Sequence, residues 1–377
     1  MKNLPIALGI ALVYLGLHFF THIHPRYESM LSFSEGKYQA ADWKISQAYL
    51  NDVVAYHKEL PAFQKRPIIT QLSSLLGGPE NQGLAWLILN YLGLLSLSLA
   101  ILLGKTLRWK EFLLFGLSFP VLFSFFPPIY SYEDLWQWTF LVLCFRFREK
   151  PSLSIAFFIL ACLVRETSLI LIPFWILLET KSDSFFQRYL KIPLIAGILG
   201  GIAVFLLWSL LSIEGAKEQE GWAYRIQHFS LNFFDANRSK ESIHAFFLTG
   251  LLPFLLLKKP SKRTWIWVGA FLLNALLIFL FAKARESRLF LLPMVFLWAG
   301  ILPFRFPKVI KVPRGILGLI LLFSGGITWI LMSNTFHISI GTPSDSPFEI
   351  YAYIYYFTSI VLIGTIIHKQ LVKRELN

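Results

Sequence analysis

The sequence predicts an all-α, polytopic transmembrane helix bundle of about 12 spans, several of them short. Hydrophobic residues make up 55% of the 377 residues, and only 15% are charged, whereas soluble domains are about 25% charged. The hydrophobic residues are gathered in runs of the length that forms membrane-spanning or buried helices. The basic residues behind the net charge of +13 stand in short clusters between these runs, which is typical of membrane proteins rather than nucleic-acid binding.

The first span is expected from Leu4 to Ile23, which matches the roughly 20 residues needed to cross a bilayer. No small residues of a signal-peptide cleavage site follow it, so we expect an uncleaved helix. The remaining spans are expected at Leu84–Leu103, Phe112–Pro127, Leu135–Phe145, Leu153–Val164, Thr167–Leu178, Ile192–Ile213, Ala245–Leu257, Thr264–Phe281, Leu289–Phe304, Gly315–Met332 and Ile350–Ile367. The whole chain, residues 1–377, is then a single integral membrane domain.

The stretch from Leu153 to Leu178 allows one helix with Arg165 at the bilayer centre, or two short helices that turn at Arg165-Glu166. A charge at the centre costs about 2.5–3.5 kcal/mol on insertion scales. With two helices and a cytoplasmic N-terminus, 21 of the 35 basic residues fall on the cytoplasmic side. We therefore expect two helices, cytoplasmic N- and C-termini, and a protein of the plasma (inner) membrane.

This topology places two large loops on the non-cytoplasmic side, residues 24–82 and residues 214–243. In the first loop, Ala41–His57 has apolar residues at helical spacing and predicts an amphipathic helix on the membrane surface. Tryptophans are expected at the membrane interfaces, where indole rings anchor spans. They are Trp109, Trp265 and Trp267 at cytoplasmic helix ends, and Trp86 and Trp329 at the other side.

Basic side chains next to apolar helix ends on the outer side are the first candidates for binding. Arg165, Lys283, Arg285 and Arg288 occupy short outer turns. The planar guanidinium group is suited to holding phosphate, and lipid headgroups lie at this depth. The alternative is that these side chains extend to the interface or pair with a neighbouring glutamate, Arg165 with Glu166 for example.

Outer carboxylates are the second set of candidates, and they are Asp42, Glu133 and Asp134. Each stands near the start of an expected helix, so helix capping and favourable interaction with the helix dipole are the alternative roles. His18 and His22 are four residues apart, which suits a metal ion, but interfacial histidines explain the pattern better. No metal site is predicted.

The order of these features resembles the GT-C superfamily of polytopic membrane glycosyltransferases. The resemblance rests on Gly36–Asp42 before the surface helix, on Arg66-Pro67 before the second span, on Tyr132-Glu133-Asp134, on Leu163–Thr167 and on Ala284–Arg288. It covers roughly residues 1–300 by layout. The sequence His24-Pro25-Arg26-Tyr27-Glu28 departs from it, because the paired acidic residues that often follow the first helix are absent.

The resemblance implies transfer of a hexose or pentose from a polyprenyl-phosphate donor to an acceptor on the non-cytoplasmic face. It assigns catalysis to Asp42, Glu133 and Asp134, with Asp42 as general base. It assigns substrate binding to Arg66, Arg165, Glu166, Lys283, Arg285 and Arg288. The implied partners are a polyprenyl-phosphate-linked sugar and membrane lipid, with no nucleic acid. No organic cofactor is implied, and a divalent metal stays open.

The chemistry is coherent from the residues alone. A phosphate leaving group needs cations more than a general acid, and one carboxylate suffices as base toward an acceptor hydroxyl. A transporter or flippase for an anionic lipid or sugar is the alternative from another class, but it would bind near the midplane at broken helices or repeats. A polysaccharide polymerase or ligase is a third possibility that also uses outer arginines.

Overall fold

The computed structural model describes most of the chain. The described residues are 3–20, 66–104, 106–118, 133–179, 186–211, 222–257, 261–282, 287–302, 312–333 and 347–375, together with the separate residues 51, 54, 55, 57, 58, 284 and 304.

Within these residues the fold is helical and contains no β-strand. The elements are α1 (Leu4–His18), α5 (Pro67–Leu102), α6 (Trp109–Gly116), α8 (Asp134–Arg146), α9 (Pro151–Val164), η2 (Glu166–Leu171), α10 (Ile172–Glu179), α11 (Phe186–Leu211), α13 (Trp222–Phe234), α14 (Ala236–Leu256), α15 (Lys262–Phe281), η3 (Ser287–Met294), α16 (Val295–Trp298), α17 (Arg314–Ser333) and α18 (Pro347–Glu375). Among the described helices, four, namely α5, α11, α15 and α17, are long and apolar enough to cross a membrane, and shorter apolar helices accompany them. The protein is therefore an α-helical, membrane-embedded protein.

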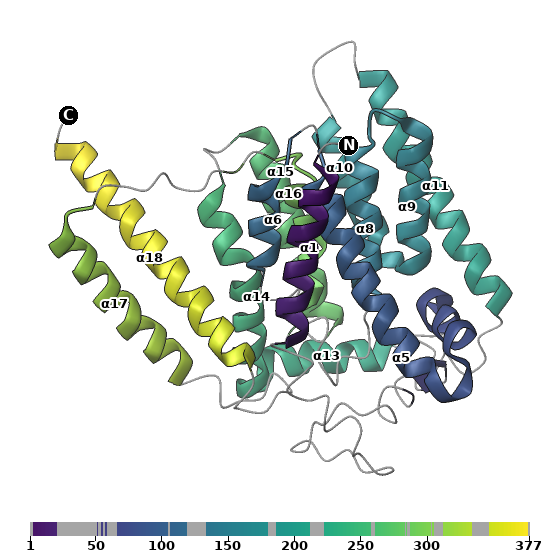
Figure 1. The fold of residues 1–377 in the computed structure, drawn as a ribbon, viewed down its shortest axis with the longest axis horizontal. Coiled ribbons are helices and arrows are strands. Elements are labelled where there is room, and N and C mark those ends of the chain that lie inside the picture. The colour runs from purple at the N-terminus through teal and green to yellow at the C-terminus, as the bar shows by residue number, and fades with distance from the viewer. Residues whose placement is uncertain are drawn as a thin grey trace.

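Most helices run roughly parallel in one bundle, whereas α13 lies across its lower end and α17 and α18 form a pair at one side (Figure 1). The pair is attached to the bundle through α14. Tyr356 Oη lies 2.7 Å from His244 Nδ1, and Tyr355 Oη accepts a hydrogen bond of 2.9 Å from the backbone N–H of Leu252. The start of α1 and the end of α18 lie toward the upper end of the molecule in Figure 1.

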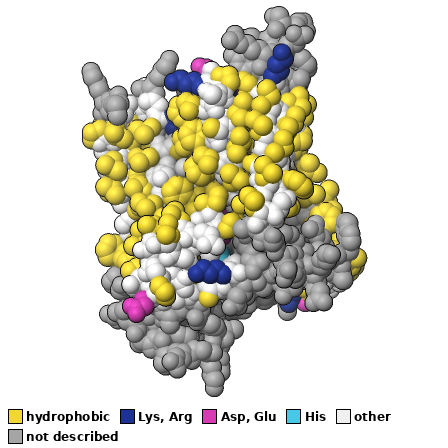
Figure 2. All heavy atoms as spheres, turned by 90° about the vertical axis from the view of Figure 1, so that its right-hand side faces the viewer, with side chains coloured by type: hydrophobic (Ala, Val, Ile, Leu, Met, Phe, Trp, Pro, Cys, Tyr) yellow, Lys and Arg dark blue, Asp and Glu magenta, His cyan; other side chains and the backbone are white. Residues whose placement is uncertain are grey.

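Hydrophobic side chains cover the middle of the face shown in Figure 2, and the described charged side chains of that face lie toward its two ends. Leu75, Leu210 and Phe205 are among the large hydrophobic residues left exposed on the described helices. In water such a surface would be costly, and a hydrocarbon environment removes that cost. The interior is packed with aromatic rings, such as Trp138 against Trp298 at 5.8 Å between centroids.

Helix α5 is interrupted about one third of the way along its length. Gly78 has a φ of 60°, which glycine adopts at little cost, and Pro79 follows it. The segment after the break corresponds to the predicted span Leu84–Leu103. The segment before it lies within the predicted first loop, residues 24–82, so this part of the loop is helical.

The predicted break at Arg165 is confirmed. Helix α9 ends at Val164, Arg165 is extended with φ −156° and ψ 118°, and the chain continues as η2 and then α10. The hydroxyl of Ser168 donates to the carbonyl oxygens of Ala161 and Arg165, which fixes the turn. Arg165 therefore lies at a helix end and not in the middle of a long helix.

The described part of the predicted second loop, residues 214–243, holds α13 and the start of α14; Ile226, Phe229 and Phe233 recur three to four residues apart, which is a helical period. The expected interfacial position of two tryptophans needs correction. Trp86 and Trp267 are 1% and 0% exposed, so they are core residues rather than interfacial anchors. The indole N–H of Trp267 donates to the carbonyl oxygen of Pro293 at 2.9 Å, which satisfies its polar atom inside the bundle. Trp109, Trp265 and Trp329 are exposed, as an interfacial position requires.

Candidate functional site

The described candidate residues gather where several helices begin or end. Asp134 opens α8, and Glu133 precedes it; Arg165 lies between α9 and η2, and Glu166 opens η2; Arg66 immediately precedes α5, and Arg288 lies in η3. Contacts join these six side chains into three groups. The sequence had placed all of them on the same side of the bilayer, and the fold brings together segments that are up to about 220 residues apart.

Asp134 is shared by two arginines. Arg165 Nη1 forms an ion pair with its Oδ1, and Arg288 Nη1 donates to its Oδ2. The Asp134 side chain is 2% exposed, and those of Arg165 and Arg288 are 9% and 6% exposed. As the first residue of α8, the carboxylate also faces the positive end of the helix dipole. Asp134 thus holds two buried guanidinium groups at a fixed separation.

The second group is the pair of Arg66 and Glu166. Arg66 donates from Nε to Glu166 Oε2 at 3.0 Å and from Nη2 to Oε1, a bidentate arrangement. Burial acts to raise the pKa of Glu166, but the charge and hydrogen bonds of Arg66, together with the charge of Arg165, lower it to about 2. This pair ties the start of α5 to the turn that carries Arg165.

The third group contains His57, which is not among the candidates predicted from the sequence. His57 Nδ1 lies 3.3 Å from Glu133 Oε1 and 3.4 Å from the hydroxyl of Thr70, and both His57 and Glu133 are almost fully buried. Burial acts to raise the pKa of Glu133, but the hydrogen bond and charge of His57 and the charge of Arg66 outweigh it and lower the pKa to about 2. His57 follows Val53 by four residues and therefore lies on the apolar face of the predicted surface helix. This position could have identified His57 as a buried residue from the sequence.

A further polar residue fixes the geometry of the site. Gln137 stands one turn after Asp134 on α8, and its Nε2 donates to the hydroxyls of Thr167 at 3.0 Å and Ser168 at 2.8 Å. These bonds connect α8 to η2, so the segment with Arg165 and the helix with Asp134 are held in register. Each partner is buried or half-buried, which strengthens the connection.

The electrostatic balance of this arginine–carboxylate cluster decides what it can do. Besides His57, its described members are three arginines (Arg66, Arg165, Arg288) and three carboxylates (Glu133, Asp134, Glu166). Burial and the charges of Arg66 and Arg288 lower the pKa of Arg165 to about 9, against the opposing effect of Glu166 and Glu133. Arg165 is therefore cationic at neutral pH and gains from any additional anion nearby. A carboxylate with both oxygens on guanidinium groups, such as Asp134, is a weak base.

Three of the sequence candidates, Asp42, Lys283 and Arg285, lie outside the described residues. His18, the described member of the histidine pair, is buried and lies 2.9 Å from Tyr91 Oη through its Nδ1, which is a packing role. Across the part of the chain that the structure describes, no three His, Cys, Asp or Glu side chains gather as a metal site would require.

No protein-family model, curated protein or solved structure matches this chain.

Proposed function

We propose that the protein is a membrane glycosyltransferase that transfers a sugar from a polyprenyl-phosphate donor to an acceptor on the non-cytoplasmic face. The observation that carries this proposal is the convergence of Arg66, Arg165 and Arg288 at one end of an apolar helix bundle. These cations lie at helix ends, the depth at which the phosphate of a lipid donor would sit.

The charge balance supports one position for the donor phosphate in this proposal. Because the three described arginines are matched by three carboxylates, a phosphate needs further positive charge. Lys283 and Arg285 are positively charged, and in the sequence they stand between α15 and Arg288. They can therefore supply this charge. The proposed phosphate site is therefore formed by Arg165 and Arg288, held by Asp134, and completed by the segment 283–285.

The carboxylates divide into two roles in this proposal. Asp134 and Glu133 position cationic groups and are poorly suited to accept a proton, because their ionised forms are already strongly stabilised. Asp42 acts as the general base toward the acceptor hydroxyl, with inversion at the sugar carbon. Phosphate leaves without a general acid because the surrounding guanidinium groups stabilise its charge.

The proposed membrane arrangement follows the distribution of basic residues. Twelve spans, of which α8, α9 and the η2–α10 segment are short ones, place the arginine–carboxylate cluster outside and both termini in the cytoplasm of a plasma (inner) membrane protein. The substrate then reaches the cluster from the outer leaflet, where nucleotide sugars are absent and a lipid-carried donor is required.

The test uses the purified full-length protein with a short-chain polyprenyl phosphate, measured by isothermal titration calorimetry in detergent. Arg165→Lys and Arg288→Lys keep the charge but lose bidentate contacts, so affinity should fall about ten- to hundredfold. Arg238→Gln, half-buried near the start of α14, is the control and should bind as the wild type does.

A polyprenyl-phosphate-hexose supplied to proteoliposomes should release polyprenyl phosphate only when an acceptor is present. Translocation of the intact lipid between leaflets, without release of sugar, would instead assign the protein to the transporters. Wild-type affinity in both lysine variants would remove these arginines from the donor site.

A further inference from the structure

A cavity of about 320 Å³ opens away from the arginine–carboxylate cluster. It is lined by residues at the start of α6 and α15 and in the turn after α16, namely Lys110, Glu111, Arg263, Gly300, Ile301, Leu302 and Phe304. The η3–α16 segment separates the two places, because Arg288 lies near one end of it and Gly300 follows the other. From the rise per residue of α- and 3-10 helices, Arg288 and Gly300 are roughly 20 Å apart along this segment.

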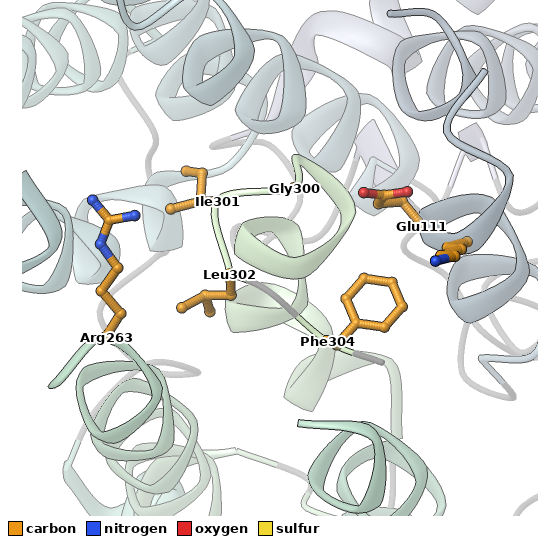
Figure 3. Close-up of a pocket in the computed structure, with 7 residues that line it drawn as sticks. Glu111, Arg263, Gly300, Ile301, Leu302 and Phe304 are labelled. Carbon is orange, nitrogen blue, oxygen red and sulfur yellow. The ribbon is translucent and has the colours of Figure 1, made fainter. Parts of the chain in front are cut away.

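The turn after α16 gives this cavity a fixed wall. Gly300 has a φ of 72°, and its N–H and that of Ile301 are bonded to the carbonyl oxygens of Leu297 and Phe296. Arg108 Nη1 donates to the carbonyl oxygen of Ala299 at 2.7 Å and would clash with a Cβ at position 300. Glycine is therefore required both for the backbone conformation and for the approach of Arg108. In Figure 3, Arg263 and Glu111 lie on opposite sides of this turn.

The lining carries an excess of positive charge in an unfavourable position. Lys110 is the second residue of α6, and Arg263 is the second residue of α15. Cations in the first turn of a helix are destabilised by the positive end of its dipole. Glu111 is the one acidic residue of the lining. An anion in the cavity would relieve both the repulsion between the cations and their interaction with the two helix dipoles.

The neighbouring tryptophans indicate the depth of the cavity in a membrane. Trp109 is 51% exposed and Trp265 is 65% exposed, and each stands in the first turn of a helix that lines the cavity. Lys110 Nζ lies 5.6 Å from the centroid of the Trp109 ring. Exposed indole rings mark the level of lipid headgroups, and basic pockets between helices at that level bind anionic headgroups.

We propose that this cavity binds the phosphate headgroup of an anionic membrane lipid, with Lys110 and Arg263 as the cations. Leu302 and Phe304 offer apolar contact to the glycerol and the first methylene groups of the lipid. The site is independent of the proposed transferase activity and lies at the other end of the η3–α16 segment. A free phosphate ion offers the same charge without the apolar part.

The experiment measures lipid retained by the purified full-length protein in nanodiscs that contain phosphatidylglycerol and phosphatidylcholine in equal amounts, by native mass spectrometry after detergent extraction. The double variant Lys110→Gln with Arg263→Gln should retain at least about tenfold less phosphatidylglycerol than the wild type. The reason is that both basic residues contribute to the affinity for an anionic lipid. The control is Lys150→Gln with Arg314→Gln, which removes one exposed lysine and one exposed arginine outside the cavity and should retain wild-type amounts.

A variant of opposite sign separates binding from folding. Glu111→Gln removes the acidic member of the lining and should increase retention of phosphatidylglycerol, which a damaged fold would not do. Inorganic phosphate at millimolar concentration, added to lipid-free protein, distinguishes the source. If phosphate raises the unfolding temperature of the wild type but not of the double variant, the cavity is a phosphate site whose ligand is soluble rather than a lipid. Equal phosphatidylglycerol retention by wild type and double variant, with no phosphate effect, would overturn the proposal.

Discussion

Asp134 at the start of α8 and Arg288 in η3 form a buried ion pair across 154 positions of the sequence. The other oxygen of the same carboxylate is occupied by Arg165. One buried anion thus compensates two buried cations from different segments, and its removal would leave both without that partner. The position of the two guanidinium groups, which the proposed donor site uses, depends on this single side chain.

Replacement of Asp134 by asparagine should therefore affect stability as well as activity. Breaking a buried ion pair costs about 3–5 kcal/mol, because the remaining charge stays desolvated. Thermal unfolding of the detergent-solubilised protein should shift to lower temperature, and a polyprenyl phosphate should restore more stability to Asp134→Asn than to wild type, because it supplies the missing anion. Equal ligand-induced shifts in both proteins would argue against a phosphate at this position.

Asp42→Asn should behave differently, because the proposed role of Asp42 is proton transfer. Asparagine caps a helix almost as well as aspartate, so expression and unfolding temperature should stay near wild type. The rate of sugar transfer should fall about 10²–10⁴-fold, with donor binding retained. If Asp42→Asn transfers sugar at the wild-type rate while Asp134→Asn is inactive at a temperature where it is folded, the base belongs to the Glu133-Asp134 segment at the start of α8 instead. Wild-type rates in both variants would exclude the carboxylate mechanism.

Acid should destabilise the protein through Glu133. The pKa of Glu133 is about 2 in the folded protein and near 4.5 in an unfolded chain, so the folded state holds its proton less tightly. The resulting stabilisation, on the order of 3 kcal/mol, is complete above pH 4.5 and is lost as the pH falls through about 2. Unfolding temperatures measured between pH 6 and pH 3 should decline, and Glu133→Gln should make that decline shallower.

The matched control for Glu133 is Glu149→Gln, an exposed acid in the turn between α8 and α9. This variant should keep the slope of the wild type. Glu166 also has a pKa of about 2, so some decline must remain in Glu133→Gln. An unchanged slope in Glu133→Gln would contradict the stabilising role of the contact with His57.

The proposed topology can be tested by labelling single cysteines in sealed cells. The native thiols Cys144 and Cys162 are buried and can be replaced by alanine to give the background. With Ser182→Cys, Ser261→Cys and Ser344→Cys as single sites, an impermeant thiol reagent applied from outside should label Ser344→Cys alone. All three should react after permeabilisation. Labelling of Ser261→Cys in sealed cells would reverse the orientation of that part of the chain and the side assigned to the arginine–carboxylate cluster.

The class of fold and the principal break within it can both be predicted from the amino-acid sequence. Apolar runs define the helices because backbone polar groups must be satisfied internally in a membrane. The break at Arg165 follows from the cost of a charge at the bilayer centre, and the same reasoning placed the candidate cations and carboxylates on one side. These inferences need only the local composition of each segment and the number of basic residues on each side of the membrane. Both can be counted from the sequence.

The pairing of the charged side chains depends on how the helices pack. Side chains of adjacent residues do not face each other, and Arg165 and Glu166 accordingly have different partners. Arg165 pairs with Asp134, and Glu166 pairs with Arg66, which is 100 positions away in the sequence. The burial of Trp86 and Trp267 also depends on helix packing. Their positions at the ends of predicted spans suggested the membrane interface, but the packed helices bury them. Pairing and burial depend on how whole helices pack against one another, and that arrangement is a property of the assembled bundle rather than of any segment.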